Sequence, residues 1–394
     1  MATSVMARRV PAASPWAFLP SDLLLDISGH LHDAGDFVRF HAVCKPWRDT
    51  AGATRPIFLP WVIAPGDDVG IIRQSTVDFR GIYSKASSNH GYVAIVEPPG
   101  APSNTTRRNW VVAADGTAAS LFVAHPEPRL IQLFTGKVTP LPPFPLEQVM
   151  EYPRGIVYAD GTIFLYQFNY EQCQDHRFDK TLAFTVSILR PGNVTWETMK
   201  KRLNVLIRNC CSAAYHNGEI LVFVGANIWC FVTLNFEANG DNMGGMLEEP
   251  WNRVSTYVLD SRGELLMASI WVDESLQCHD NHHQVLSVTL KEVEGSSWKR
   301  WLRKDGRSLG DRLLFLGSPA SFTMDAAQLG TSGGYVYFPF RRGMFCYNLA
   351  NGMAKRVKRP RSEWRVEDLC VWLQPQPAIA PIQEIKESIN GANE

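Results

Sequence analysis

The residues that most resemble a catalytic nucleophile are Gly330, Ser332 and Gly334, which match the pattern G-x-S-x-G. In hydrolases this pattern holds a reactive serine on a turn between a strand and a helix. Here the residues that follow, 335–338, read YVYF and predict a strand instead of a helix. Because the required context is missing, we interpret the match as a glycine-rich turn.

A second group, Cys278, His279, His282 and His283, carries thiol and imidazole side chains that can bind a transition metal. Its spacing matches no common zinc pattern, and it lies where a loop between strands is expected. The eight cysteines of the chain include no C-x-x-C pair, and the sequence has neither a P-loop nor a G-x-G-x-x-G motif. We therefore expect no metal, no cofactor and no catalytic residues, and a function other than that of an enzyme.

The composition is that of a globular protein without a strong charge of either sign. Of the 394 residues, 45% are apolar and 20% charged, and 39 basic residues balance 39 acidic ones. Zero net charge disfavours general binding to nucleic acids or anionic membranes. The longest uncharged stretch, residues 220–236, is shorter than the roughly 20 residues that span a bilayer, and we expect a hairpin there. Residues 1–15 lack the apolar run of a secretory signal, so we expect a disordered leader and a cytoplasmic location, a nuclear location, or both.

Residues 16–54 predict a small helical unit. Aliphatic residues recur there at helical spacing: Leu23, Leu24, Ile27 and Leu31. Pro20 suits a first helical position, and shorter helices are expected to begin after Asp33 and at Pro46. About 40 residues bury too little surface to be robust alone, so such a unit usually packs against a partner.

From about residue 60, short β-rich runs separated by turn signals replace the helical pattern. Three turns carry dipeptides that hairpins need: Asp160-Gly161, Asn217-Gly218 and Arg262-Gly263. The glycines of these turns are 57 and then 45 residues apart, and four short strands fit each interval. Such a diffuse repeat is typical of a β-propeller.

The expected fold is therefore mainly β with a small α-helical N-terminal part. Residues 60–373 would form a propeller of six or seven blades, followed by a C-terminal tail over residues 374–394. A pair of large β-sandwiches is the main alternative. The propeller is favoured because its closure leaves few exposed strand edges.

Charge is unevenly distributed along the β-rich region. Residues 236–294 hold 11 acidic and 3 basic residues, whereas residues 295–365 hold 14 basic and 4 acidic ones. Solvated loops are the simpler interpretation, and a polarised face that selects a charged partner is the functional one. Candidate contacts for such a partner are Glu248, Glu249, Asp273, Glu274, Arg341 and Arg342. We expect the basic run 355–361 in a solvated loop after the last strands, with a nuclear localisation signal or a partner patch as alternatives.

Two segments of the helical part resemble the F-box motif. Residues 19–27 read LPSDLLLDI and residues 37–48 read FVRFHAVCKPWR, which follow the family pattern of Leu-Pro, spaced aliphatics and a final Val-Cys-x-x-Trp-Arg. Gly29, and the pair His32-Asp33 in place of a frequent proline, are mild departures. Further segments resemble a plant family, abundant in grasses, that joins an F-box to a C-terminal β-propeller: residues 139–144, 255–259, 263–266, 314–317 and 321–322.

This resemblance implies a substrate-recognition subunit of an SCF-type ubiquitin ligase. The F-box would dock on a Skp-type adaptor, and through it on a cullin scaffold, while the propeller would hold an unknown target protein near the ubiquitin-carrying enzyme. The expected adaptor-binding residues are Leu19, Pro20, Leu23, Leu24, Ile27, Leu31, Val43, Cys44 and Trp47. Three alternatives remain: these side chains pack against the propeller, the protein is a scaffold or inhibitor without degradation, or the propeller binds a small ligand in its central channel.

Overall fold

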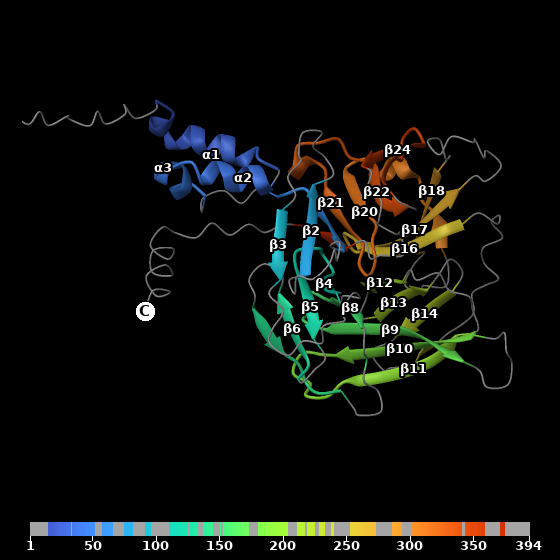
Figure 1. Ribbon diagram of the computed structural model, residues 1–394. Helices are drawn as coiled ribbons and strands as arrows, with labels where there is room; N and C mark the ends of the chain where they lie inside the picture. The colour runs from blue at the N-terminus through green and yellow to red at the C-terminus, as the bar shows by residue number, and fades with distance from the viewer. Residues whose placement is uncertain are drawn as a thin grey trace, which may run out of the picture. The chain divides into compact units, whose positions relative to one another are not determined.

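The computed structural model divides the chain into two compact units, residues 1–59 with 375–394, and residues 60–374 (Figure 1). It describes residues 15–32, 34–51, 57–65, 75–81, 91–95, 110–123, 127–132, 137–144, 150, 153–172, 180–203, 211–216, 219–224, 228–232, 238–239, 253–272, 286–293, 301–340, 343–358 and 371–374. Of these, β-strands make up most, so the prediction of a mainly β chain with few helices is confirmed.

The first unit contains a 3-10 turn and three short α-helices: η1 (Pro15–Phe18), α1 (Ser21–Gly29), α2 (Ala34–His41) and α3 (Lys45–Asp49). Pro20 lies just before α1, at its N-cap, and not at the predicted first helical position. Pro46 lies in the first turn of α3, where its missing N–H removes no helical hydrogen bond. Asp33 lies outside the described residues. Within the described part of the chain, no helix is long and apolar enough to cross a membrane.

The second unit is built from strands in five sheets over its described residues. The first sheet has the order β25-β1-β2-β3, with β1 (Trp61–Pro65), β2 (Ser75–Gly81), β3 (Gly91–Ile95) and β25 (Val371–Leu373). The second has eight strands in the order β11-β10-β9-β8-β4-β5-β6-β7: β4 (Trp110–Ala113), β5 (Ala119–Val123), β6 (Arg129–Gln132), β7 (Val138–Pro140), β8 (Arg154–Val157), β9 (Ile163–Gln172), β10 (Lys180–Leu189) and β11 (Glu197–Leu203).

Two four-stranded sheets follow in chain order. One contains β12 (Cys211–His216), β13 (Glu219–Val224), β14 (Ile228–Val232) and β15 (Ala238–Asn239), and the other contains β16 (Arg253–Ser261), β17 (Glu264–Val272), β18 (Leu286–Val293) and β19 (Trp301–Arg303). The hairpin predicted within residues 220–236 is confirmed as β13 and β14. The last sheet has the order β21-β20-β22-β23-β24: β20 (Arg312–Phe315), β21 (Phe322–Asp325), β22 (Tyr335–Phe340), β23 (Gly343–Asn348) and β24 (Met353–Lys358). The 3-10 turns η3 (Gly306–Leu309) and η4 (Ala327–Leu329) connect some of these strands.

The eight-stranded sheet consists of two four-stranded antiparallel runs. They join where β4 and β8, the first strand of each run, pair in parallel. β12 and β16, the first strands of the next two sheets, also contact each other. Within this unit, Figure 1 shows the sheets following one another in chain order from β3 through β9 and β16 to β24.

The two ends of this unit meet in the first sheet. β1 pairs with β25, with Val62 opposite Trp372. The Trp372 side chain is 2% exposed, its ring packs edge-on against Phe315 at 5.2 Å, and its indole N–H donates to the carbonyl of Leu316 at 2.8 Å. The last described strand thus ties the beginning of the unit to the sheet of β20.

The segment between β20 and β21, residues 316–321, is buried. The Ala213 N–H on β12 donates to the carbonyl of Pro319 at 3.1 Å. Ala320 belongs to a buried cluster with residues of four different strand groups, among them Trp110 of β4, Ile156 of β8, Ala213 of β12 and Leu373 of β25. Residues 316–321 therefore fill space between β4, β8, β12 and β25.

Ion pairs connect the β16–β17 turn to the hairpin formed by β20 and β21. Arg262 and Gly263 have φ of 56° and 78°, as a two-residue hairpin turn of type I′ requires. Arg262 pairs with Asp311, just before β20, and with Asp325, at the end of β21. These two contacts give a reason for an arginine in a left-handed conformation that asparagine or glycine adopts more easily. Gly161, in a second predicted turn, has φ of 87°, whereas residues 217–218 lie outside the described residues.

Candidate interaction site on the helical unit

A buried histidine connects the three helices of the first unit. His41, on α2, is fully buried; its Nε2 lies 2.8 Å from Ser28 Oγ on α1, and its Nδ1 lies 2.5 Å from the carbonyl oxygen of Trp47 on α3. A carbonyl only accepts, so Nδ1 carries the proton, and Nε2 accepts from the Ser28 hydroxyl. The neutral ring therefore satisfies one group on each neighbouring helix.

These contacts decide which face of α1 is buried. Leu24 and Ser28, four residues apart, are 1% and 0% exposed, whereas Leu23 and Ile27 are 50% and 40% exposed. Residues four apart share one face of a helix, so α1 has a buried face and an exposed apolar face. The Leu24 side chain, which was predicted to bind the adaptor, lies in the interior of the unit. Leu23 and Ile27 present the available apolar side chains of this helix.

Trp47 contributes to the packing of the unit. Its ring lies 4.4 Å from that of Phe40, and its indole N–H donates to the carbonyl of Trp16 at 3.1 Å. The side chain of Trp47 is half-buried, as are Leu19, Leu31 and Cys44, while Pro20 is exposed. The hydrogen bond to Trp16 fixes η1 and leaves the Trp16 side chain in solvent.

Exposed apolar side chains are concentrated in this unit. Six of the ten large apolar side chains that are exposed among the described residues belong to it: Trp16, Phe18, Leu23, Ile27, Val38 and Val43. We call these six side chains the exposed apolar set. Trp16 and Phe18 are 65% and 74% exposed and were not among the predicted adaptor-binding residues. The sequence pattern that could have indicated them is a pair of aromatic residues shortly before the Leu-Pro pair. Of this set, Leu23 and Ile27 lie on one face of α1, and an exposed apolar helix face is typical of a binding surface.

The burial of His41 predicts that the helical unit loses stability in acid. Burial lowers the pKa of His41 below its ordinary value of 6.5, and the hydrogen bond to Trp47 only partly opposes that shift. At pH values between the folded pKa and 6.5, His41 binds more protons in the unfolded chain than in the folded one. The contribution of His41 to the free energy of unfolding is therefore fully present above about pH 6.5 and decreases as the pH falls below that value.

Hydrogen-exchange protection of the α1, α2 and α3 amides, measured from pH 7.5 to 5 and corrected for intrinsic rates, should show this decrease. A His41→Gln variant should be less stable at pH 7.5 and should show a flat profile. Equal protection of the wild type across the range would contradict the role of His41.

The other residues singled out in the sequence do not form a site among the described residues. Gly330 and Gly334 have φ of 60° and 79°, and β22 follows directly, so the glycine-rich turn is confirmed. Outside the described residues lie Cys278, His279, His282, His283, Glu248, Glu249, Asp273, Glu274, Arg341 and Arg342. Where the structure describes side chains, no group of three or more His, Cys, Asp or Glu could hold a metal ion.

The basic run lies elsewhere than predicted. Lys355 and Arg356 pair in register with Cys346 and Phe345, so the run begins inside β24 and not in a loop after the last strands. β24 is the outer strand of its sheet, and charged side chains on an outer strand discourage pairing with other chains. Residues 359–361 lie outside the described residues.

Four-stranded antiparallel groups that follow one another, and whose ends meet in one sheet, define a β-propeller protein. A family model described as KIB1-4 beta-propeller matches residues 88–348. The chain belongs to this KIB1-4 β-propeller family, and the propeller supports a role in protein interaction. No curated protein sequence matches the chain.

Solved structures show only distant likeness. A lignostilbene dioxygenase of Pseudomonas brassicacearum is 8% identical, with a TM-score of 0.34, over 77% of this chain and 78% of that chain. YCF48 bound to D1 peptide is 8% identical, with a TM-score of 0.33, over 77% and 81%. An exo-1,5-α-L-arabinanase from a bovine ruminal metagenomic library is 10% identical, with a TM-score of 0.26, over 66% and 95%.

Proposed function

We propose that the protein is a substrate-recognition subunit of an SCF-type ubiquitin ligase, located in the cytoplasm, the nucleus or both. Its helical unit is an F-box that docks on a Skp-type adaptor, and its propeller binds the target protein. The protein itself makes and breaks no bonds; it acts by proximity, because it holds target lysines near the ubiquitin-carrying enzyme.

The exposed apolar set carries this proposal. The unit packs its interior around His41 and Leu24 and still leaves aromatic and aliphatic side chains in solvent on η1, α1 and α2. Helical apolar faces of this kind bind grooves on partner proteins, and exposed aromatics supply the strongest contacts. The F-box resemblance of residues 19–27 and 37–48 names the partner class.

We also infer that the propeller has six blades. Four-stranded runs begin at β4, β8, β12 and β16, the sheet of β20 to β24 forms a fifth blade, and β25 completes a sixth with β1, β2 and β3. The pairing of β25 with β1 gives this sixth sheet its fourth strand.

The alternative of a small ligand in the central channel is less well supported. Residues 316–321 occupy space between the first strands, with Ala320 packed among them. A scaffold or inhibitor without degradation would use the same docking surface. Only the fate of the bound target distinguishes it from a ligase subunit.

Co-purification of the full chain with a Skp-type adaptor tests the proposal, and target half-life in cells separates its two forms. A ligase subunit should shorten the half-life of the bound protein in a manner that proteasome inhibition reverses. An unchanged half-life of a protein that binds both the chain and the adaptor would favour the scaffold. Failure of the folded chain to bind any Skp-type adaptor would overturn both.

A further inference from the structure

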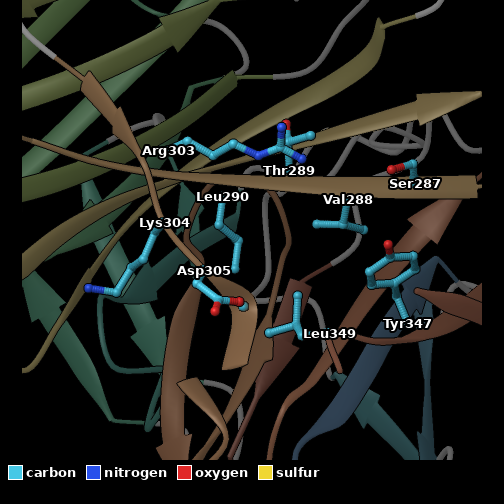
Figure 2. A pocket seen from close by; sticks show the side chains of 10 residues that line it. Ser287, Val288, Thr289, Leu290, Arg303, Lys304, Asp305, Tyr347 and Leu349 are labelled. Atoms are coloured by element: carbon cyan, nitrogen blue, oxygen red, sulfur yellow. The ribbon is translucent and has the colours of Figure 1, made fainter. Parts of the chain in front are cut away.

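A pocket of about 220 Å³ is lined by residues of two neighbouring propeller sheets. The lining comes from β18, from the segment that follows β19, and from the end of β23: Ser287, Val288, Thr289, Leu290, Arg303, Lys304, Asp305, Gly306, Tyr347 and Leu349 (Figure 2). Pockets for drug-sized ligands usually enclose roughly 300–1,000 Å³. A ligand of this pocket is therefore a smaller molecule.

The floor of the pocket is apolar. Val288 and Leu290 are buried, and they belong to the apolar cluster that also contains Tyr347. Leu349 packs against this cluster from the other sheet. The cluster is separate from the one that contains Ala320, so the pocket is not the central channel of the propeller.

The polar side chains of the lining divide between the two faces of β18. Alternate residues of a strand point to opposite faces, so Thr289 lies on the face opposite to Val288 and Leu290. Figure 2 shows Arg303 on the side of Thr289 and Asp305 on the side of Leu290. The apolar floor and Asp305 therefore share one chamber, and the Arg303 side chain lies outside it.

Among the described residues that line this chamber, Asp305 supplies the charge that no ion pair compensates. It is exposed, and its Oδ1 accepts from the Arg307 N–H at 3.0 Å. Lys304 is held by Glu264 and Glu292, and Figure 2 shows it extending away from the other side chains. A carboxylate at the rim of an apolar floor attracts a cation that has an apolar body.

Tyr347 adds a hydroxyl that has no hydrogen-bond partner within the described part of the chain. The side chain is 7% exposed, and Figure 2 shows its hydroxyl directed toward β18. Buried hydroxyls nearly always have a partner, so each exception needs an explanation. A polar group of a ligand bound in the pocket would supply the missing partner.

We propose that this pocket binds a small primary amine with an apolar body and a hydroxyl group. The ammonium group lies beside the Asp305 carboxylate at the rim, and the body packs against Val288, Leu290 and Leu349. The hydroxyl group of the ligand pairs with that of Tyr347. This site belongs to the propeller alone, and the inference does not rest on the proposed function.

Tyramine is a suitable probe, because it carries an ammonium group and a phenol hydroxyl at the two ends of an apolar body. Saturation-transfer NMR with the full-length protein should show saturable binding of tyramine. Phloretate, in which a carboxylate replaces the ammonium group, should bind about tenfold more weakly. Phenethylamine, which lacks the hydroxyl, should bind about fivefold more weakly.

Asp305→Asn removes the charge and keeps the cap of η3, because asparagine caps about as well as aspartate. This variant should weaken tyramine binding about tenfold. Asp115→Asn is the matched control and should leave the affinity unchanged. Asp115 is exposed and its Oδ1 also accepts from the N–H two residues further on, but it does not line the pocket.

Tyr347→Phe should weaken binding of tyramine about fivefold and leave that of phenethylamine unchanged, since only tyramine offers a hydroxyl. The three probes decide the proposal on the wild type without any variant. No saturable binding of tyramine, equal binding of phloretate, or equal affinities of Asp305→Asn and Asp115→Asn would overturn it. Leu23→Glu/Ile27→Lys, on the helical unit, should keep tyramine binding, so failure of the two proposals is distinguishable.

Discussion

Trp372→Ala should lower the free energy of unfolding of the propeller unit by about 3–5 kcal/mol, the range for removing a fully buried tryptophan. The side chain fills space against Phe315, and its indole N–H satisfies the carbonyl of Leu316. Its strand is also the one that pairs with β1 and closes the unit. The loss should therefore be global, and urea unfolding of the full chain measures it.

Two further variants separate packing from hydrogen bonding at this position. Trp372→Phe keeps most of the ring but removes the N–H, so we expect a loss of about 1–3 kcal/mol from the unsatisfied carbonyl and the smaller side chain. Leu302→Ala, on an exposed part of β19, should cost less than about 0.5 kcal/mol. If Trp372→Ala costs no more than Leu302→Ala, the C-terminal strand does not close the propeller.

Leu23→Glu/Ile27→Lys should weaken binding to a Skp-type adaptor about a thousandfold. Each side chain is exposed on α1, and a central apolar contact is worth about 2 kcal/mol or more when lost. Two such losses sum to about 4 kcal/mol, and each 1.4 kcal/mol is a factor of ten. The substitutions keep the helix folded, because an acidic residue suits its first turn and a basic residue its last.

Val138→Glu/Val194→Lys is the matched control for this pair. Both valines are exposed, on the propeller unit, and the same two charges are introduced. Adaptor affinity, measured by isothermal titration calorimetry, should stay within a factor of two of the wild type. Equal loss in both variants would show that added charge, and not the α1 face, explains the effect.

Local patterns in the sequence predicted the parts of the fold that depend on neighbouring residues. Gly161 and the pair Arg262-Gly263 have the positive φ that their turns require, because turn chemistry is decided by two or three adjacent residues. The same holds for the hairpin of β13 and β14.

Pairings between distant segments could not be predicted in this way. β1 and β25 are separated by about three hundred residues, and no local pattern in either states that they meet. The burial of residues 316–321 among the first strands is likewise a property of the assembled sheets, since the segment itself reads as an ordinary turn.

The candidate site was predictable in part for the same reason. Helical spacing identified α1 as apolar, but three consecutive leucines leave the buried face undecided. Ser28 and His41 decide it through a contact between helices, which places Leu24 inside and Leu23 outside. Trp16 and Phe18 were not predicted as contacts because they precede the helically spaced aliphatic residues on which the prediction rested.

Hydrogen–deuterium exchange of the full chain with and without a Skp-type adaptor tests the central claim most directly. Docking through the exposed apolar set should slow exchange in residues 16–47 and leave the propeller strands unchanged. Protection confined to the propeller, or none at saturating adaptor, would contradict the assignment of the helical unit as the docking element.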